Sequence, residues 1–309
     1  MMRVALIGGT GFVGRYLVDA LRVAGREVSL LVRPGSETKL ASANACRMVH
    51  GDLASRSAIA RTLADCDAVI YNVGILREFP RRQITFEALQ YEGLVQVADA
   101  ARACGLSRLL LMSANGVTAN GTAYQRTKYR AEQYALNSGL AVTVFRPAVI
   151  FGDPRGAMEI ATQLCRDMIK PPLPALGFVS GWRPSRGQIL MSPVHVEDVA
   201  AAFNAALDDA STIGRTFVLG GPESLSWTEM LTRIASSIGR RKWIIPMPLP
   251  VMQLAAAAFD WSPFFPVTRD QLTMLASGNT VDPSELESLI GRPLRGFTRQ
   301  NLAYLGGPQ

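Results

Sequence analysis

Short apolar runs alternate with amphipathic segments of helical period through the first two-thirds of the 309-residue chain. Strands are expected at 4–7, 28–32, 68–72, 109–112, 142–145 and 217–219, and helices at 14–24 and 87–103, among others. The strand runs are apolar almost throughout, which is typical of strands buried on both faces. The pattern therefore predicts an α/β fold, a doubly wound parallel sheet covered by helices on both faces.

The alternation of strands and helices breaks at two places along the chain. Residues 153–192 are interrupted by Pro, Gly and Trp, and no clear alternation returns beyond Gly221. We expect a sheet domain over 1–152, completed by 193–220, and a smaller lobe from 153–192 and 221–309. Open α/β sheets bind ligands at the carboxyl ends of their strands, so this lobe is expected to hold the substrate.

Composition and charge narrow the classes of protein that fit this chain. Apolar residues make up 48% and charged residues 18%, which excludes a disordered chain and a coiled coil. The 28 arginines and 4 lysines outnumber 25 acidic residues, and this balance favours an anionic partner. No basic run exceeds three residues, so no nucleic acid is expected. Two histidines, and four cysteines without a Cys-x-x-Cys pair, predict no metal site.

The sequence also bears on location. No signal-peptide pattern opens the chain, and no apolar stretch of about 18 residues follows. We therefore expect a cytoplasmic protein, and peripheral contact with the inner membrane or a membrane complex stays open. Residues 244–265 and Trp243 fit a helix of the lobe that packs on the sheet domain, or a surface for a membrane or a quinone-like tail. The packed helix is the preferred interpretation.

A glycine-rich loop lies between the first expected strand and the first expected helix. Its G-x-x-G-x-x-G spacing permits a tight turn, and its backbone can approach a pyrophosphate at the positive end of the helix. The loop residues expected at a cofactor are Gly8, Thr10, Gly11, Phe12, Val13 and Gly14. The loop predicts a dinucleotide-binding Rossmann domain in the first part of the chain.

The end of the second expected strand indicates which dinucleotide is bound. An NAD-binding protein usually carries Asp or Glu there to hold the ribose 2′-hydroxyl. Arg33 stands there instead, with Lys39 further on, and cations suit a 2′-phosphate. NADP(H) is therefore favoured over NAD(H), which stays open because Arg33 could also stack on adenine or point to solvent.

Two further strand ends carry candidate cofactor residues. Residues 50–53 are expected to end a further strand between those at 28–32 and 68–72, and there Asp52, followed by Leu53, is placed to accept a hydrogen bond from the adenine amino group. Asn72, Val73 and Gly74 end the next strand, where small residues let the backbone approach the cofactor. An ordinary turn explains either segment alone, but their positions at successive strand ends favour binding.

Three polar residues form a candidate catalytic set. Tyr124 and Lys128 are four residues apart, so they share one face of an expected helix, and Ser113 follows the strand expected at 109–112. The ammonium of Lys128 is expected to lower the pKa of the Tyr124 phenol, which lets it exchange a proton near neutral pH. The hydroxyl of Ser113 can hold a substrate carbonyl.

Together these residues resemble the short-chain dehydrogenase/reductase superfamily, extended and atypical type. Within it the chain is similar to the nucleotide-binding accessory subunit of mitochondrial complex I and its bacterial relatives, on residues 124–132 and 266–275. The resemblance implies that Tyr124 is the proton donor or acceptor, that Lys128 also holds the nicotinamide ribose, and that Ser113 orients the reacting oxygen. It further places Pro147, Ala148, Val149 and Ile150 near the nicotinamide.

The leading functional hypothesis is an NADP(H)-binding reductase of a carbonyl or enone carbon in a small molecule, and an apolar or quinone-like substrate stays open. The subgroup resemblance supports an alternative, a non-catalytic NADPH-loaded assembly or stability module of a quinone-linked membrane complex or of quinone biosynthesis. A third hypothesis is an NAD-dependent sugar-nucleotide epimerase, which Arg33 disfavours. The sequence does not indicate an oligomeric state.

Overall fold

The computed structural model describes the chain except for residues 40–45, 181–186, 253, 255–268 and 308–309. The chain divides into two compact units. Unit 1 comprises Met1–Pro147, Glu197–Val218 and Ser288–Ile290, and unit 2 comprises Ala148–Val196, Leu219–Glu287 and Gly291–Gln309. Each unit is therefore assembled from separate stretches of sequence.

Unit 1 is built on a seven-stranded sheet in the order β11-β6-β5-β4-β1-β2-β3. Its strands are β1 (Arg3–Ile7), β2 (Glu27–Val32), β3 (Arg47–His50), β4 (Ala68–Tyr71), β5 (Arg108–Met112), β6 (Ala141–Pro147) and β11 (Thr216–Leu219). The pairs from β3 through β6 are parallel. The strand order reverses beside β1, which is where doubly wound sheets bind ligands. The predicted doubly wound parallel sheet is confirmed.

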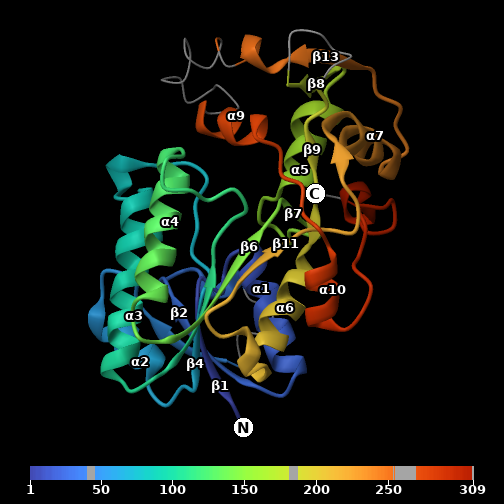
Figure 1. Ribbon diagram of the computed structural model, residues 1–309. Helices are drawn as coiled ribbons and strands as arrows, with labels where there is room; N and C mark the ends of the chain where they lie inside the picture. The colour runs from blue at the N-terminus through green and yellow to red at the C-terminus, as the bar shows by residue number, and fades with distance from the viewer. Residues whose placement is uncertain (40–45, 181–186, 253, 255–268, 308–309) are drawn as a thin grey trace. The chain divides into compact units, whose positions relative to one another are not determined.

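Helices cover both faces of this sheet. They are α1 (Phe12–Val23), α2 (Arg56–Leu63), α3 (Gly93–Ala103), α4 (Ala123–Leu136) and α6 (Val196–Asp208), with the short turns η1 (Glu37–Lys39), η3 (Pro80–Arg82) and η6 (Ala210–Thr212). Figure 1 shows α2, α3 and α4 on one face and α1 and α6 on the other. Alternate strand residues feed the two cores because successive side chains point to opposite faces. Ala5 and Ile7, for example, pack in the core beneath α2, α3 and α4.

The helix expected over 87–103 has two parts, a π-helical segment η4 (Glu87–Glu92) and then α3. The hydroxyl of Tyr71 donates a 2.5 Å hydrogen bond to the carbonyl oxygen of Leu89. The N–H of Gly93 bonds the carbonyl of Ala88, five residues back, instead of that of Leu89. A side chain from the sheet thus changes the hydrogen-bond pattern of the helix. Such π-helical turns often occur near functional sites.

Unit 2 consists of short strand pairs and helices around its own core. The strands are β7 (Ile150–Phe151) with β10 (Val194–His195), β8 (Ala175–Val179) with β13 (Ile244–Pro248), and β9 (Leu190–Met191) with β12 (Leu225–Ser226). The helical segments are α5 (Ile160–Leu164), η5 (Cys165–Ile169), α7 (Trp227–Ser237), α9 (Arg269–Ala276) and η7 (Ala303–Gly306). Helix α10 (Ser284–Ile290) belongs to unit 2 as far as Glu287, and its last three residues belong to unit 1. The core includes Phe151, Phe178, Trp227 and Phe297.

The preferred interpretation of residues 244–265 as a packed helix is wrong for its first part. Residues Ile244–Pro248 form strand β13, which pairs in parallel with β8. The prolines in this segment lack an amide donor and fix φ, which disfavours a helix interior. Residues 253 and 255–265 lie outside the described part of the chain, as do 266–268 of the subgroup motif. None of the helices in the described part of the chain has the length and hydropathy of a transmembrane span.

Arg108 of β5 ties the returning segment of unit 1 to the sheet. Its guanidinium donates to the hydroxyls of Thr143 in β6 and Thr212 in η6, at 2.8 and 2.9 Å. It also donates to the carbonyl oxygens of Ala141 and Ala206, both at 2.8 Å. A single half-buried cation thus joins β5, β6, α6 and η6.

We predict that Arg108→Met lowers the free energy of unfolding by about 3 kcal/mol, because several acceptors lose a charge-assisted hydrogen bond. Urea denaturation followed by circular dichroism measures the change. Arg102→Met is the matched control, because Arg102 is exposed and forms a surface ion pair at 3.6 Å with Asp99, three residues earlier on the same helix. Its effect should stay within about 0.5 kcal/mol. Equal losses in the two variants would contradict the role given to Arg108.

Candidate active site

The glycine loop joins β1 to α1 at the centre of the sheet, and two of its positions admit no side chain. Gly8 has φ +92°, and a Cβ there would lie 2.4 Å from the carbonyl oxygen of Asn72. A Cβ on Gly14 would lie 2.2 Å from the carbonyl oxygen of Gly8. No side chain caps α1, whose N-cap is Gly11 in extended conformation. The amides of its first turn therefore face outward from the loop as an anion site.

The other loop residues complete this cradle. Thr10, Phe12 and Val13 are half-buried, and Gly11 is exposed. The carbonyl oxygen of Thr10 accepts a 3.3 Å hydrogen bond from Nε of Arg15, which holds the loop on its own helix. The loop is thus fixed on its own helix, and the amide of Gly11 closes it by bonding the carbonyl of Gly8 at 3.4 Å.

The predicted 2′-phosphate residues lie on an exposed turn after β2. Arg33 and Lys39 are both exposed. The amide of Ser36 bonds the carbonyl of Arg33 at 2.9 Å, and the amide of Lys39 bonds that of Ser36 at 3.2 Å. Glu37, which sequence reasoning missed, buries its Oε2 without a hydrogen-bond partner among the described residues. Nothing in its sequence position signals that burial.

The ends of β3 and β4 hold the next group of predicted residues. Asp52 is exposed, and its Oδ1 accepts a 3.0 Å hydrogen bond from the amide of Ala54. Leu53 lies beside Gly93, where an added Cβ would come within 2.8 Å of it. Nδ2 of Asn72 lies 3.4 Å from the carbonyl oxygen of Gly8, so the end of β4 contacts the glycine loop.

Lys128 on α4 is buried between the ends of β4 and β5. Its Nζ donates to the carbonyl oxygen of Met112 at 3.0 Å and to that of Val73 at 3.4 Å. A Cβ on Gly74 would lie 3.5 Å from the same nitrogen. Two of the three ammonium donors are therefore engaged, and one is left for a ligand.

The charge of Lys128 is set by its surroundings. Burial lowers the pKa of Lys128 to about 8, and nearby Glu132 partly opposes this. Glu132 is itself buried and accepts a 2.9 Å hydrogen bond from Nε of Arg146. The Arg146 guanidinium thus compensates the buried carboxylate one helical turn beyond Lys128.

Ser113 and Tyr124 are buried in the same unit. Oγ of Ser113 is buried and has no hydrogen-bond partner among the described residues, although its amide bonds the carbonyl of Phe145 at 2.7 Å. Tyr124 precedes Lys128 by one turn of α4 and packs edge-to-face on Phe86, with ring centroids 5.6 Å apart. A buried hydroxyl without a partner marks a place where a polar ligand atom fits.

The protonation of Tyr124 differs from the sequence-based expectation. Burial raises the pKa of Tyr124 to about 12, whereas the spacing to Lys128 predicted a lowered pKa. Burial removes the phenolate from water and disfavours it, so the phenol is protonated at neutral pH. This is the form that can donate a proton.

Buried amide side chains that sequence reasoning missed hold α4 in position. Gln90 in η4 donates to the carbonyl of Ile75 at 3.1 Å and accepts from the hydroxyl of Thr127 at 2.9 Å. Gln125 donates to the carbonyl of Gly116 at 2.7 Å. These bonds connect α4 to the segments that follow β4 and Ser113. Single glutamines on an amphipathic helix give little signal of such a role.

The residues predicted near the nicotinamide divide between the two units. Pro147 ends β6 and unit 1, and its carbonyl oxygen accepts a 2.8 Å hydrogen bond from the amide of Asn115. Ala148, Val149 and Ile150 belong to unit 2. There the amide of Ala148 bonds a carbonyl in β11, the carbonyl of Val149 accepts from β10, and Ile150 opens β7. The residues in 8–74, together with Ser113, Tyr124, Lys128 and Pro147, share unit 1.

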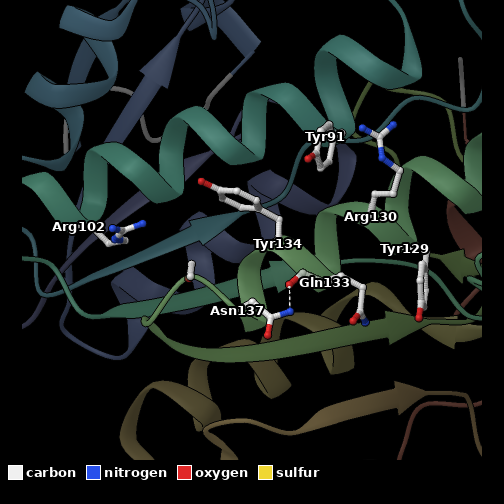
Figure 2. A pocket seen from close by; sticks show the side chains of 8 residues that line it. Tyr91, Arg102, Tyr129, Arg130, Gln133, Tyr134 and Asn137 are labelled. Atoms are coloured by element: carbon white, nitrogen blue, oxygen red, sulfur yellow. Dashed lines mark hydrogen bonds between the residues drawn. The ribbon is translucent and has the colours of Figure 1, made fainter.

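A hollow of about 450 Å³ lies on the surface of η4, α3 and α4. Figure 2 shows tyrosines 91, 129 and 134 around it, with Arg130 beside Tyr91. The Arg130 guanidinium lies 3.9 Å from the Tyr91 ring centroid and also pairs with Glu87. None of the predicted cofactor or catalytic residues lines this hollow, so it is a different feature of unit 1.

Known proteins show similarity along the whole chain. A family model described as NAD(P)H-binding matches residues 8–166, just over half of the sequence. The mitochondrial NADH dehydrogenase (ubiquinone) 1 alpha subcomplex subunit 9 of Arabidopsis thaliana is 28% identical, over 98% of this chain and 78% of that protein. A protein of Caulobacter vibrioides named ceramide reductase is also 28% identical, over 84% of this chain and 78% of that protein.

A solved structure shares the fold. The NADPH-dependent quinone oxidoreductase QOR2 from Escherichia coli superimposes with a TM-score of 0.72 at 17% identity, covering 98% of this chain and all of that one. The matched segment 8–166 contains the glycine loop, the ends of β2 to β5, and the Ser113, Tyr124 and Lys128 set. The chain thus belongs to the NAD(P)H-binding family, and its relatives and fold are consistent with the resemblance to extended short-chain dehydrogenases/reductases.

Proposed function

We propose that the protein is an NADP(H)-dependent reductase of a carbonyl or enone substrate, with Tyr124 as the proton donor. The observation that carries this proposal is the position of Lys128. Its buried ammonium bonds the residue before Ser113 and the middle of the Asn72–Gly74 segment, one helical turn from Tyr124. One cation therefore adjoins both the cofactor-binding strand ends and the candidate catalytic hydroxyls.

Each residue of this set has a role that its environment supports. The unpartnered hydroxyl of Ser113 donates a hydrogen bond to the substrate carbonyl oxygen. The protonated phenol of Tyr124 transfers its proton to the substrate, and Lys128 stabilises the phenolate that forms. The remaining N–H of Lys128 holds the nicotinamide ribose. Bound NADPH supplies the hydride that reduces the carbonyl or enone carbon.

The preference for NADP(H) rests on the turn after β2. Arg33 and Lys39 are exposed there, and no acidic residue occupies the first position after the strand. A guanidinium binds a phosphate through paired, charge-assisted hydrogen bonds, and an acid at the same place would repel it. Asp52 is assigned to the adenine amino group, because only its Oδ1 is engaged by the amide of Ala54.

We assign the binding of the substrate to residues 153–192 and 221–309. We expect an apolar molecule, because the Caulobacter relative is named ceramide reductase and its name implies a lipid substrate. A cytoplasmic location, or one at the periphery of the inner membrane, fits such a substrate.

A second candidate function is a nucleotide-loaded module without turnover, attached to a quinone-linked membrane complex. The similarity to a complex I subunit over 98% of the chain favours it. The two functions differ in one measurement, since only a reductase oxidises NADPH in the presence of ketones, enones or quinones.

The proton-donor role predicts that Tyr124→Phe lowers kcat by at least about 100-fold, because general acid catalysis typically contributes that much. The Kd for NADPH should stay within about twofold, since the phenylalanine keeps the packing against Phe86. Loss of NADPH absorbance and an NADPH fluorescence titration measure the two quantities. Unchanged turnover would remove Tyr124 from the mechanism.

The pKa of Lys128, about 8, predicts a pH dependence. The ammonium is charged below this pH and neutral above it, so kcat/KM for NADPH, which reports the free protein, should fall as pH rises through about 8. Lys128→Arg should abolish this break, because a guanidinium stays charged. Lys39→Arg, at an exposed position, is the matched control and should keep it. A break that survives in Lys128→Arg would assign the titration to another group.

If Arg33 binds the 2′-phosphate, Arg33→Glu should lower the ratio of kcat/KM for NADPH to kcat/KM for NADH by at least about tenfold. A change of this size corresponds to the loss of about one charge-assisted contact. Glu37→Gln serves as the companion variant, because it removes the one acid on the same turn. An unchanged coenzyme ratio in Arg33→Glu would show that Arg33 does not contact the 2′-phosphate.

A further inference from the structure

One edge of unit 2 exposes large apolar side chains beside cations. Trp243 is 84% exposed, Leu173 71% and Ile245 48%. They lie where the strands β8 and β13 begin, and Figure 1 shows these strands side by side. We call these three residues, together with the exposed Lys170, Arg240 and Arg241, the tryptophan edge.

Hydrogen bonds hold the two segments of the tryptophan edge together. The amide of Ala175 donates to the carbonyl of Trp243 at 2.8 Å. The Arg240 guanidinium donates to the carbonyl of Lys170 at 3.0 Å, and Nζ of Lys242 lies 3.0 Å from the last carbonyl of η5. The exposed side chains therefore project from a connected backbone, and their solvent exposure is a property of the folded unit.

The charge on these segments has one sign. Residues 168–180 and 230–254 contain no Asp or Glu. Their cations are Arg233, which pairs with Glu223 at 2.6 Å, and Lys170, Arg240, Arg241 and Lys242. The acid that precedes the first segment, Asp167, accepts a 2.6 Å hydrogen bond from its neighbour Arg166. The surface is therefore complementary to an anionic partner.

The combination of side chains distinguishes between anionic partners. Indole rings accumulate at the headgroup level of bilayers, and leucine and isoleucine enter the acyl boundary beneath it. Arginine and lysine bind lipid phosphates from the same depth, because their aliphatic stems tolerate the interface. A surface for single-stranded nucleic acid would offer several aromatic rings for stacking. Here aliphatic side chains flank a single ring.

We propose that the tryptophan edge docks the protein on membranes that contain anionic phospholipids. Trp243, Leu173 and Ile245 enter the interface, and Arg240 and Arg241 bind lipid phosphates. This inference goes beyond the proposed reductase function, because none of the residues assigned to the cofactor or to catalysis belongs to the edge. It brings unit 2 to a surface from which an apolar substrate can be taken.

Cosedimentation of the full chain with vesicles tests the proposal. The protein should bind vesicles of phosphatidylcholine with phosphatidylglycerol much more tightly than vesicles of phosphatidylcholine alone, and added salt should weaken the binding. Brominated acyl chains should quench part of the tryptophan fluorescence. That part should disappear in Trp243→Phe, because the quenching requires this ring to lie in the interface.

Two variants separate the apolar from the electrostatic contribution. Trp243→Ser should weaken vesicle binding by about tenfold, as expected for removing a large apolar side chain from the interface. Arg241→Gln should weaken it by about fivefold, corresponding to about 1 kcal/mol for one cation at an anionic surface. Val23→Ser and Arg102→Gln are matched controls at exposed positions of unit 1 and should bind like the wild type. NADPH affinity should be unchanged in all four variants, which verifies their folding.

Three results would overturn the proposal. The first is equal binding to vesicles with and without phosphatidylglycerol. The second is wild-type binding by Trp243→Ser and Arg241→Gln. The third is vesicle binding that shows no quenching by brominated acyl chains and that RNA and an acidic peptide displace equally well. This result would identify a general polyanion surface. Any of these results, obtained with protein that binds NADPH normally, would refute the membrane docking. The proposed reductase function would be unaffected.

Discussion

The buried ammonium of Lys128 is the constraint on which the arrangement of the site depends. Taking a charged amine out of water is costly, and the cost is recovered only through hydrogen bonds and nearby opposite charge. Lys128 obtains them from carbonyl oxygens at the ends of β4 and β5 and from Glu132 on its own helix. The sheet and α4 must therefore keep a fixed mutual position, and the segment after β4 must stay beside Ser113.

The neighbouring contacts maintain that position. Gln90 bonds the chain after β4 and Thr127 of α4, and it lies in η4, whose hydrogen-bond pattern Tyr71 alters from the sheet. Arg146 at the end of β6 compensates Glu132. Polar groups from β4, β6 and η4 thus stabilise one helix face, on which Tyr124 is held protonated by burial. The environment that raises the pKa of the phenol also lowers that of the amine.

Sequence patterns predicted those parts of the molecule that depend on local periodicity or on backbone geometry. Six of the seven strands of the large sheet are apolar runs, so their positions followed from the sequence, whereas β3 begins and ends on a polar residue and shows no such run. Gly8 and Gly14 stand where a Cβ would meet backbone atoms. The π-helical turn could not be predicted, because it depends on a hydroxyl from another strand. The pKa of Tyr124 likewise depends on burial that spacing does not encode. The strands β7, β9, β10 and β12 are two residues long and show no periodicity.

The most direct test of this account is the pKa of Lys128 with and without NADPH. The chain has only four lysines, so their ε-methylene carbons can be resolved by NMR and the Lys128 signal assigned by its absence in Lys128→Arg. A pKa of about 8 is expected in the free protein. Saturation with NADPH should raise this pKa, because a third hydrogen bond to the charged amine favours its protonated form. A titration that NADPH leaves unchanged, although the nucleotide binds, would contradict the central role of Lys128.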